Sequence, residues 1–416
     1  MAMIFVLKSN PNRSSIRCLR FLLLLSVLGV AVSIANASDV TNKAPDALKA
    51  SSDIPACHGK LVLVTGATGR VGRMVTTKLY ERGHCVRIFT RSATKARETL
   101  GHLIDTNNEA TINTVVEIAV GELGDGTSVD KAFASRETSG NAAVSHVVFA
   151  AGGEEADFDA VNNRGVRECA VRAAEAGTTS MVVISAAWVS KPYSLASLLF
   201  NALHDNFPMA KHLQGEDSLR QEAVQQSSYN DGKETTTNEG LNYVILRAGR
   251  LRPDEEYPPD AARGLLYQQG DSFSFFGPAG NPGMDNTQLA LAVLSAMTVK
   301  GQYTVEVTGG TVDPHDVSIY SQFVEDDFVQ VSYDDIVLCH TKALYHLKVG
   351  IAGLVMVMMM FLFSSTSKTG KLQMLLQLIA GLAFFIGYWT VFQSDISVLD
   401  MVESNQQSGF VQENDL

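Results

Sequence analysis

The sequence is poor in cysteine and has no excess of positive charge. Its five cysteines are scattered without a Cys-x-x-Cys pair, so neither a zinc site nor a disulfide framework is predicted. We interpret them as small buried hydrophobes. The formal net charge is -11, which offers no gain from counterion release on a phosphate backbone, so nucleic acid is not expected as a partner. His204 and His212 have no acid or cysteine at ligand spacing, and no metal site is predicted.

Acidic residues are missing from the start of the chain up to Asp39. Basic residues precede a short apolar run at 21–34, and Ala35-Asn36-Ala37 follows the small-residue rule for signal cleavage. This pattern predicts a secretory signal over 1–37, which routes the chain to the endoplasmic reticulum or to an organelle reached through it. An uncleaved anchor and an organellar presequence are the alternatives. Residues 38–58 are polar and aperiodic, which indicates a linker.

Long apolar runs free of charge are confined to the C-terminal part after the leader. Residues 372–392 carry no charged side chain and are long enough to cross a bilayer of ~30 Å. Residues 349–363 reach spanning length only if 343–348 join them, with Lys348 extending to the interface. We therefore predict a transmembrane helical hairpin over 343–393 with the lipid bilayer as partner, the alternative being a buried hairpin. An acidic connector over 311–342 precedes it, and an acidic tail over 394–416 follows.

Between the linker and the connector, short apolar runs alternate with longer amphipathic stretches. Strands are predicted at 61–64, 85–89, 115–120, 146–150, 181–184, 243–246 and 304–308, and helices at 71–82 and 161–176. The second helix is expected to end at Gly177. Strands alternating with helices indicate an α/β fold, a doubly wound parallel sheet of the Rossmann type over 59–310. The polar, turn-rich run at 225–240 is interpreted as an insertion.

The segment TGATGRVG at 65–72 follows the first predicted strand and opens the first helix. Gly66 can adopt the positive φ of a tight turn, Gly69 lets the backbone approach a pyrophosphate, and Gly72 lets the helix pack closely on the strand. The helix N-terminus then faces the phosphates with unpaired N–H groups. The candidate contacts within this segment are Gly66, Thr68, Gly69, Arg70, Val71 and Gly72.

The glycine spacing resembles the atypical, NmrA-like branch of the short-chain dehydrogenase/reductase superfamily. Four further segments are similar to motifs of that branch, over roughly 59–310: VRIFTR at 86–91, VGEL at 120–123, AAGG at 150–153 and GEDSLR at 215–220. YVILRAG at 243–249 is similar to a later strand of the branch. The resemblance implies an NAD(P)-binding Rossmann protein and adds Glu122, Leu123, Ala150, Ala151 and Gly152 to the candidate cofactor contacts.

The residues after the second strand indicate which cofactor is bound. An NAD enzyme usually places an acid about 20 residues after the glycines, where it bonds the ribose 2′-OH. No acid occurs between Arg82 and Arg97, whereas Arg91 stands at the end of the predicted strand. A guanidinium is suited to a 2′-phosphate, so NADP is predicted as the cofactor, with NAD less favoured.

The resemblance also implies a catalytic Ser, Tyr and Lys. Ser185 lies at the end of the fifth strand and Lys211 precedes the GEDSLR segment, so these are the candidate catalytic residues. Four residues before Lys211 stands Phe207, which has no proton to give, and Tyr193 does not have the required spacing. An NADP(H)-dependent oxidoreductase is predicted. A non-catalytic redox sensor or assembly factor at a membrane is the alternative, and a nucleotide-sugar isomerase or epimerase is the third.

Two features predict the orientation of the chain in the membrane. Translocation after the leader places the Rossmann domain on the lumenal side. Lys368 and Lys371 lie in the turn of the hairpin, which the positive-inside rule assigns to the cytosol. Lys342 and Lys348 on the domain side oppose this assignment.

Overall fold

The fold was analysed in a computed structural model of the whole chain. The structure describes residues 61–104, 116–134, 143–153, 157–204, 207–230, 241–252, 264–270, 283–326, 331–363 and 396–402, with short pieces between 375 and 382. The chain divides into two compact units, one of Pro55–His346 with Gly381–Leu416 and one of Met1–Ile54 with Leu347–Ala380. The leader and the linker lie outside the described residues, as do most of 372–392 and of the tail.

The described strands form one eight-stranded sheet in the larger unit, in the order β3-β2-β1-β4-β5-β6-β8-β7. The strands are β1 (Leu61–Thr65), β2 (Cys85–Thr90), β3 (Val116–Val120), β4 (Val144–Phe149), β5 (Ser180–Ala186), β6 (Asn242–Ala248), β7 (Gly264–Gln268) and β8 (Gln302–Gly310). Neighbouring strands are parallel, except that β7 runs antiparallel to β8. This confirms the predicted Rossmann fold, because the order reverses after β1 as in dinucleotide-binding folds.

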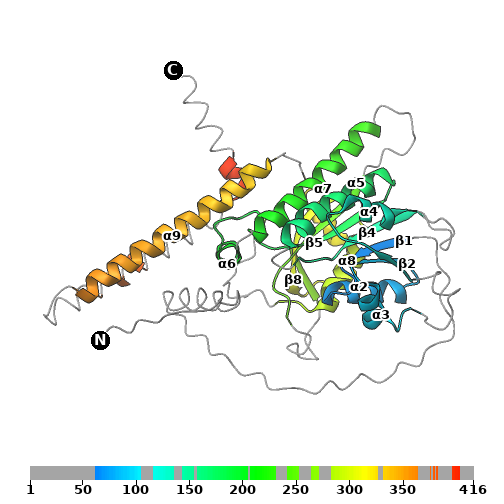
Figure 1. Cartoon of the computed structure of the whole chain (residues 1–416), viewed down its shortest axis with the longest axis horizontal. Coiled ribbons are helices and arrows are strands. Elements are labelled where there is room, and N and C mark those ends of the chain that lie inside the picture. The colour runs from blue at the N-terminus through cyan, green and yellow to red at the C-terminus, as the bar shows by residue number, and fades with distance from the viewer. Residues whose placement is uncertain are drawn as a thin grey trace, which may run out of the picture. The chain divides into compact units, whose positions relative to one another are not determined.

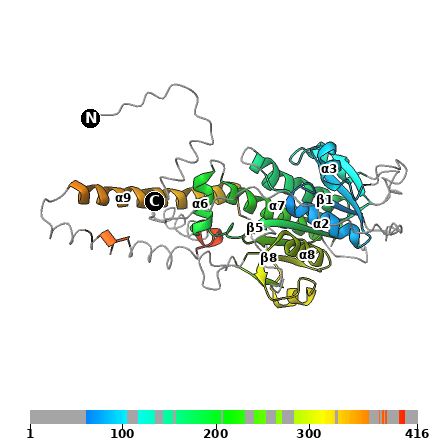
Figure 2. The same ribbon diagram turned by 90° about the horizontal axis from the view of Figure 1, so that it is seen from below.

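Helices cover both faces of the sheet (Figure 1). One face carries α2 (Arg70–Glu81), α3 (Ala93–Leu100) and α8 (Asn286–Ala296), and α2 and α8 lie side by side (Figure 2). The other carries α4 (Gly126–Phe133), α5 (Val166–Glu175) and α7 (Pro208–Asn230). β1 shows how the sequence divides the core, because Val62 and Val64 pack with α2 and α8 while Leu61 and Leu63 pack with α5 and α7.

The predicted elements of the sheet domain occur with small changes in length. The helix predicted at 161–176 begins as a π-helix, η3 (Asp159–Gly165), and continues as the α-helix α5. Gly177 follows α5 with φ 65, which confirms the predicted helix end. The remaining described helices are α6 (Leu195–Leu203), the 3-10 helix η5 (Val317–Gln322) and α9 (Tyr333–Phe363).

Helices extend into two of the predicted segments. The run at 225–240 was expected to be an insertion, but α7 continues through Asn230, since each residue added to a formed helix gains a hydrogen bond. The connector over 311–342 contains η5, and α9 begins at Tyr333 rather than at 343. Ser332 accepts a hydrogen bond from the Asp335 amide at 3.2 Å, which caps the start of α9. Within the described residues, no helix combines the length and apolarity that crossing a membrane requires.

The cysteines differ from the prediction at one position. Cys169 and Cys339 are buried free thiols, and burial raises the pKa of Cys169 to about 12 and that of Cys339 to about 11. Both therefore behave as the small buried hydrophobes that were predicted. Cys85 is disulfide-bonded, which scattered cysteines without a recognisable spacing do not reveal.

Candidate functional site

The predicted cofactor residues follow the carboxyl ends of four adjacent strands. Gly66 to Gly72 follow β1, Arg91 follows β2, Glu122 and Leu123 follow β3, and Ala150 to Gly152 follow β4. These strands are neighbours in the order β3-β2-β1-β4, so one edge of the sheet brings all of these residues together. The edge includes the point where strand order reverses, which is where open α/β sheets bind ligands.

The glycine turn after β1 is held by close backbone contacts. Gly66 has φ 67, and a Cβ on it would come within 2.5 Å of the Ala151 Cα, so the turn lies directly against the segment after β4. A Cβ on Gly72 would lie 2.2 Å from the Gly66 carbonyl oxygen. Both positions therefore require glycine, as the sequence predicts.

The start of α2 supplies a site for an anion. Gly69 is its N-cap residue and makes no side-chain cap, and the first turn carries no acid. Gly69 and Arg70 are exposed, Thr68 and Val71 are half-buried, and Gly152 has no atom within 4 Å of the place a Cβ would take. The unpaired N–H groups and positive end of this helix, beside a side-chain-free surface, are suited to a pyrophosphate.

Arg91 stands at the place where cofactor selection was predicted. Its side chain is 66% exposed, and its Nη1 atom lies 3.0 Å from the Asp157 Oδ2 atom. The Gly121 amide donates to the Thr90 carbonyl oxygen at 3.0 Å, so the ends of β2 and β3 adjoin. Glu122 is exposed there, whereas Leu123 packs on the core between the sheet and α5.

Ser185 and Lys211 are each engaged with an acidic residue. The Ser185 hydroxyl donates to Glu216 Oε1 at 2.6 Å, and Lys211 Nζ lies 2.8 Å from Asp159 Oδ1. Burial acts to raise the pKa of Asp159, but the contacts of its carboxylate with Lys211, Asn163 and Arg164 outweigh burial and hold this pKa below the ordinary value. The two candidate catalytic residues thus reach the same edge from β5 and α7 but bond to different acids.

Glu216 is the centre of a buried ionic network that the sequence analysis missed. It is 1% exposed and also accepts hydrogen bonds from Arg247 Nη2 at 2.7 Å and from Arg220 Nη2 at 3.1 Å. Burial opposes ionisation, but the two guanidinium groups outweigh it and hold the pKa of Glu216 below its ordinary value. The sequence did contain an indication of this network. Arg247 directly follows the apolar run of β6, and a buried charge there needs a partner of opposite charge.

The residues around the missing tyrosine have unusual backbone geometry. Phe207 has φ 47 and Trp188 has φ 66, a region that residues with a Cβ adopt rarely. Tyr193 is directed elsewhere, since its hydroxyl lies 2.9 Å from Nδ1 of His346 on α9. Among the described residues, the structure offers no tyrosine at the predicted position for proton transfer.

The two histidines of this region are used in packing. His212 Nε2 lies 3.2 Å from the Asn162 amide nitrogen, and burial lowers the pKa of His212 to about 4. The His204 ring packs on Phe158 and Phe200, with centroids 5.5 and 6.4 Å away. In the part of the chain that the structure describes, no group of three His, Cys, Asp or Glu side chains could hold a metal ion.

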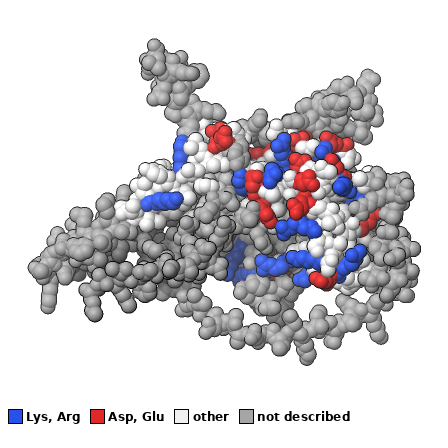
Figure 3. Space-filling model, in the orientation of Figure 1, with Lys and Arg blue, Asp and Glu red and all other residues white. Residues whose placement is uncertain are grey.

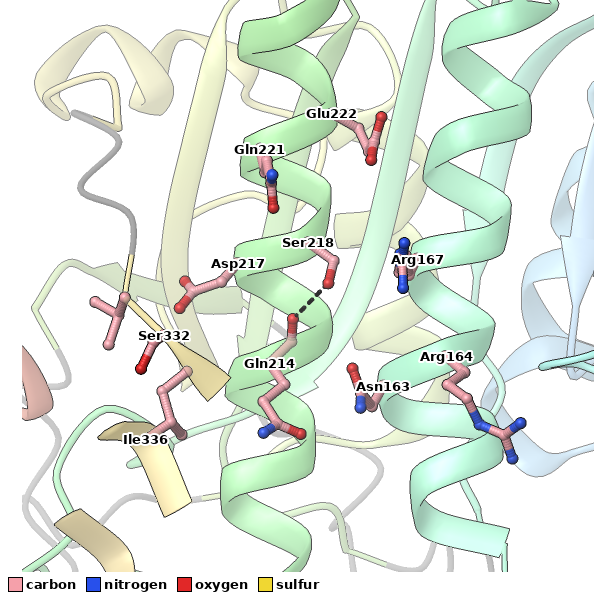
Figure 4. Close-up of a pocket in the computed structure, with 11 residues that line it drawn as sticks. Asn163, Arg164, Arg167, Gln214, Asp217, Ser218, Gln221, Glu222, Ser332 and Ile336 are labelled. Carbon is pink, nitrogen blue, oxygen red and sulfur yellow. Dashed lines mark hydrogen bonds between the residues drawn. The ribbon is translucent and has the colours of Figure 1, made fainter. Parts of the chain in front are cut away.

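A polar groove of about 560 Å³ is lined by residues of η3, α5 and α7 and of the start of α9. Figure 4 shows side chains of η3, α5 and α7 lining it, among them Arg164, Arg167, Asp217 and Glu222. Burial raises the pKa of Asp217 to about 6 despite its bond to Arg220.

Figure 3 shows Lys and Arg interspersed with Asp and Glu over the face that it presents.

Comparison with known proteins agrees with this geometry. The family model described as NAD(P)H-binding matches residues 66–274, half of the chain, from the first glycine of the turn to beyond β7. The chain belongs to the NAD(P)H-binding family. This confirms the prediction of an NAD(P)-binding protein with a nicotinamide dinucleotide as the ligand.

The solved structures to which this chain is similar are distant from it in sequence. The oxidoreductase ylbE from Lactococcus lactis is 13% identical with a TM-score of 0.42, over 64% of this chain and 99% of that one. Serine dehydrogenase from Escherichia coli is 16% identical with a TM-score of 0.39, over 59% and 96%. A short chain dehydrogenase/reductase family protein is 19% identical with a TM-score of 0.39, over 64% and 100%. Comparison with curated protein sequences found no match.

Proposed function

We propose that the chain is an NADP(H)-dependent oxidoreductase attached to a membrane. The observation that carries the cofactor choice is Arg91, an exposed guanidinium directly after β2 at the edge that holds the glycine turn. No acid occurs between Arg82 and Arg97 to bond a ribose 2′-OH. A planar guanidinium instead suits a 2′-phosphate, to which it can donate two parallel hydrogen bonds.

Different residues of this edge would bind different parts of the cofactor. Gly66, Gly69 and the N-terminus of α2 would hold the pyrophosphate, and Arg91 the 2′-phosphate. When bound, the nicotinamide supplies or accepts a hydride. Ser185 would orient a substrate carbonyl by donating its hydroxyl proton to the carbonyl oxygen in place of Glu216, and Lys211 would add positive charge near it. Phe207 has no proton to transfer, and the resulting loss is about 10²–10⁴-fold in rate for reactions that need acid–base catalysis at that position. We therefore expect simple alcohols to be poor substrates.

A second candidate function is a non-catalytic dinucleotide sensor or assembly factor. The contacts of the two candidate catalytic residues favour it, since Ser185 donates to buried Glu216 and Lys211 pairs with Asp159. In this alternative both residues stabilise the fold around the cofactor and neither meets a substrate.

NADPH oxidation by the purified full chain over a panel of carbonyl substrates separates the two candidates. For an oxidoreductase we expect turnover with at least one carbonyl, reduced in Ser185→Ala and Lys211→Ala. NADPH affinity should stay within about threefold of wild type in Ser185→Ala. A chain that binds NADPH but turns over no carbonyl, with variants altered only in stability, would support the sensor and contradict the enzyme.

The membrane attachment and the route to the lumen rest on the sequence. The uncharged run at 372–392 and the basic, acid-poor leader support a membrane hairpin and a secretory route. The disulfide at Cys85 is in keeping with that route, because disulfides persist in oxidising compartments. We propose that the Rossmann domain is lumenal.

A further inference from the structure

The ion pair between Arg91 and Asp157 joins the ends of two strands that are not neighbours. Arg91 follows β2 directly, and Asp157 stands two residues before η3, in the connection that follows β4. The Nη1 and Oδ2 atoms lie 3.0 Å apart, and the two side chains are 66% and 40% exposed. In the sheet, β2 and β4 flank β1 on its two sides. The pair therefore crosses above the carboxyl end of β1, where the glycine turn begins.

Backbone contacts fix Asp157 at this place. A Cβ on Gly153 would come within 3.0 Å of the Asp157 carbonyl oxygen, so the two backbones touch. The Gly153 amide in turn donates to Asn162 Oδ1 of η3 at 3.3 Å. The backbone of Asp157 therefore contacts the segment after β4, and that segment is hydrogen-bonded to η3. These contacts fix the position from which the Asp157 carboxylate reaches Arg91.

We propose that Asp157 is a specificity-determining residue that competes with the 2′-phosphate of NADP(H) for Arg91. This inference rests on the proposed function. A phosphate that bonds the Arg91 guanidinium replaces the carboxylate or lies beside it, and two anions at hydrogen-bonding distance from one cation repel each other. The adenosine 2′-OH of NAD(H) carries no charge and meets no such repulsion. Asp157 therefore lowers the preference for NADP(H) that Arg91 provides.

Calorimetric titration of the full chain with NADPH and NADH tests the competition. Asp157→Asn keeps the size of the side chain and removes its charge. Exposed ion pairs of this kind are weak, so NADPH should bind Asp157→Asn about two- to fivefold more tightly than wild type. NADH affinity should stay the same or fall, because an amide offers no better partner to a 2′-OH. In an Arg91→Ala background the gain from Asp157→Asn should shrink.

Glu81→Gln is the matched control. Glu81 forms an exposed ion pair with Lys78 at 2.7 Å at the C-terminal end of α2, opposite the glycine turn. This variant should leave both affinities unchanged. If Asp157→Asn leaves NADPH affinity unchanged or weakens it while Arg91→Ala weakens it, the competition is wrong and the cofactor choice stands. If Arg91→Ala has no effect on NADPH, the proposed cofactor choice fails, and the competition fails with it.

Discussion

At the scale of single residues, Gly72 is the position where the candidate cofactor site tolerates least change. A Cβ there would lie 2.2 Å from the Gly66 carbonyl oxygen and 3.0 Å from the Ala67 Cα, both of them backbone atoms. Gly72→Ala should therefore force α2 away from β1 and lower the free energy of unfolding by about 1–3 kcal/mol, with loss of dinucleotide affinity.

Chemical denaturation together with calorimetry checks this. Gly177→Ala is no suitable control, because Gly177 has φ 65. Arg73→Ala is suitable, since Arg73 is an exposed side chain on the same helix. A Gly72→Ala variant as stable as Arg73→Ala would contradict the close packing.

The residues of the site differed in how far sequence reasoning could predict them. The positions of the glycines and of Arg91 were predictable because they depend on where β1 and β2 end, which a local pattern reveals. Glu216 and Asp157 were not, because each acts through a partner 31 or 66 positions away. Such partners come together only in the folded chain, and a single sequence does not show which distant residues will be in contact.

At the scale of elements, the first part of α9, up to His346, contacts α6 through a buried histidine. His340 is fully buried, its Nδ1 atom lies 3.0 Å from the Asn201 amide nitrogen of α6, and burial lowers its pKa from 6.5 to about 4. A neutral His340 can accept from that amide, whereas a protonated ring would place two donors face to face. The contact between His340 and Asn201 therefore requires an uncharged ring.

This attachment predicts a pH dependence. The unfolded chain protonates His340 below about 6.5 and the folded chain only near 4, so the contribution to stability falls as the pH drops from 6.5 to 4. The loss should be on the order of 3 kcal/mol at most. His212 acts in the same direction, and Asp217, with a pKa raised to about 6, acts oppositely between 3.8 and 6.

Hydrogen exchange of peptides from 333–346 isolates the contribution of His340. In wild type, exchange should quicken between pH 6.5 and 4.5 after correction for the intrinsic rate, and in His340→Gln this change should be smaller. An identical pH dependence in the two chains would show that His340 does not control the attachment.

The elements show where periodicity is a good guide. The buried strands β1 to β6 and β8 were predictable because apolar runs bounded by turns have few other interpretations. β7 was not, since it is an antiparallel edge strand of five residues, GLLYQ, without a clear alternation. The start of α9 was missed because its first turn is acidic, and Asp334 and Asp335 are favourable at a helix N-terminus for electrostatic reasons that hydropathy ignores.

At the scale of the whole molecule, the proposed membrane orientation can be tested directly. The leader and the Lys368–Lys371 turn both predict a lumenal Rossmann domain. In sealed microsomes, added protease should leave the domain intact and should digest it only after detergent is added. Digestion without detergent would contradict the lumenal placement, and a domain released by carbonate washing would contradict membrane attachment.

The central claim is that this Rossmann domain selects NADP(H) through Arg91. The most direct measurement is calorimetric titration of the full chain with NADPH and with NADH at the same ionic strength, for wild type and Arg91→Ala. We predict tighter binding of NADPH by wild type, and a loss of about 1.5–3 kcal/mol for NADPH alone in Arg91→Ala, as for a charge-assisted hydrogen bond. Equal affinities of wild type for the two cofactors would contradict the claim.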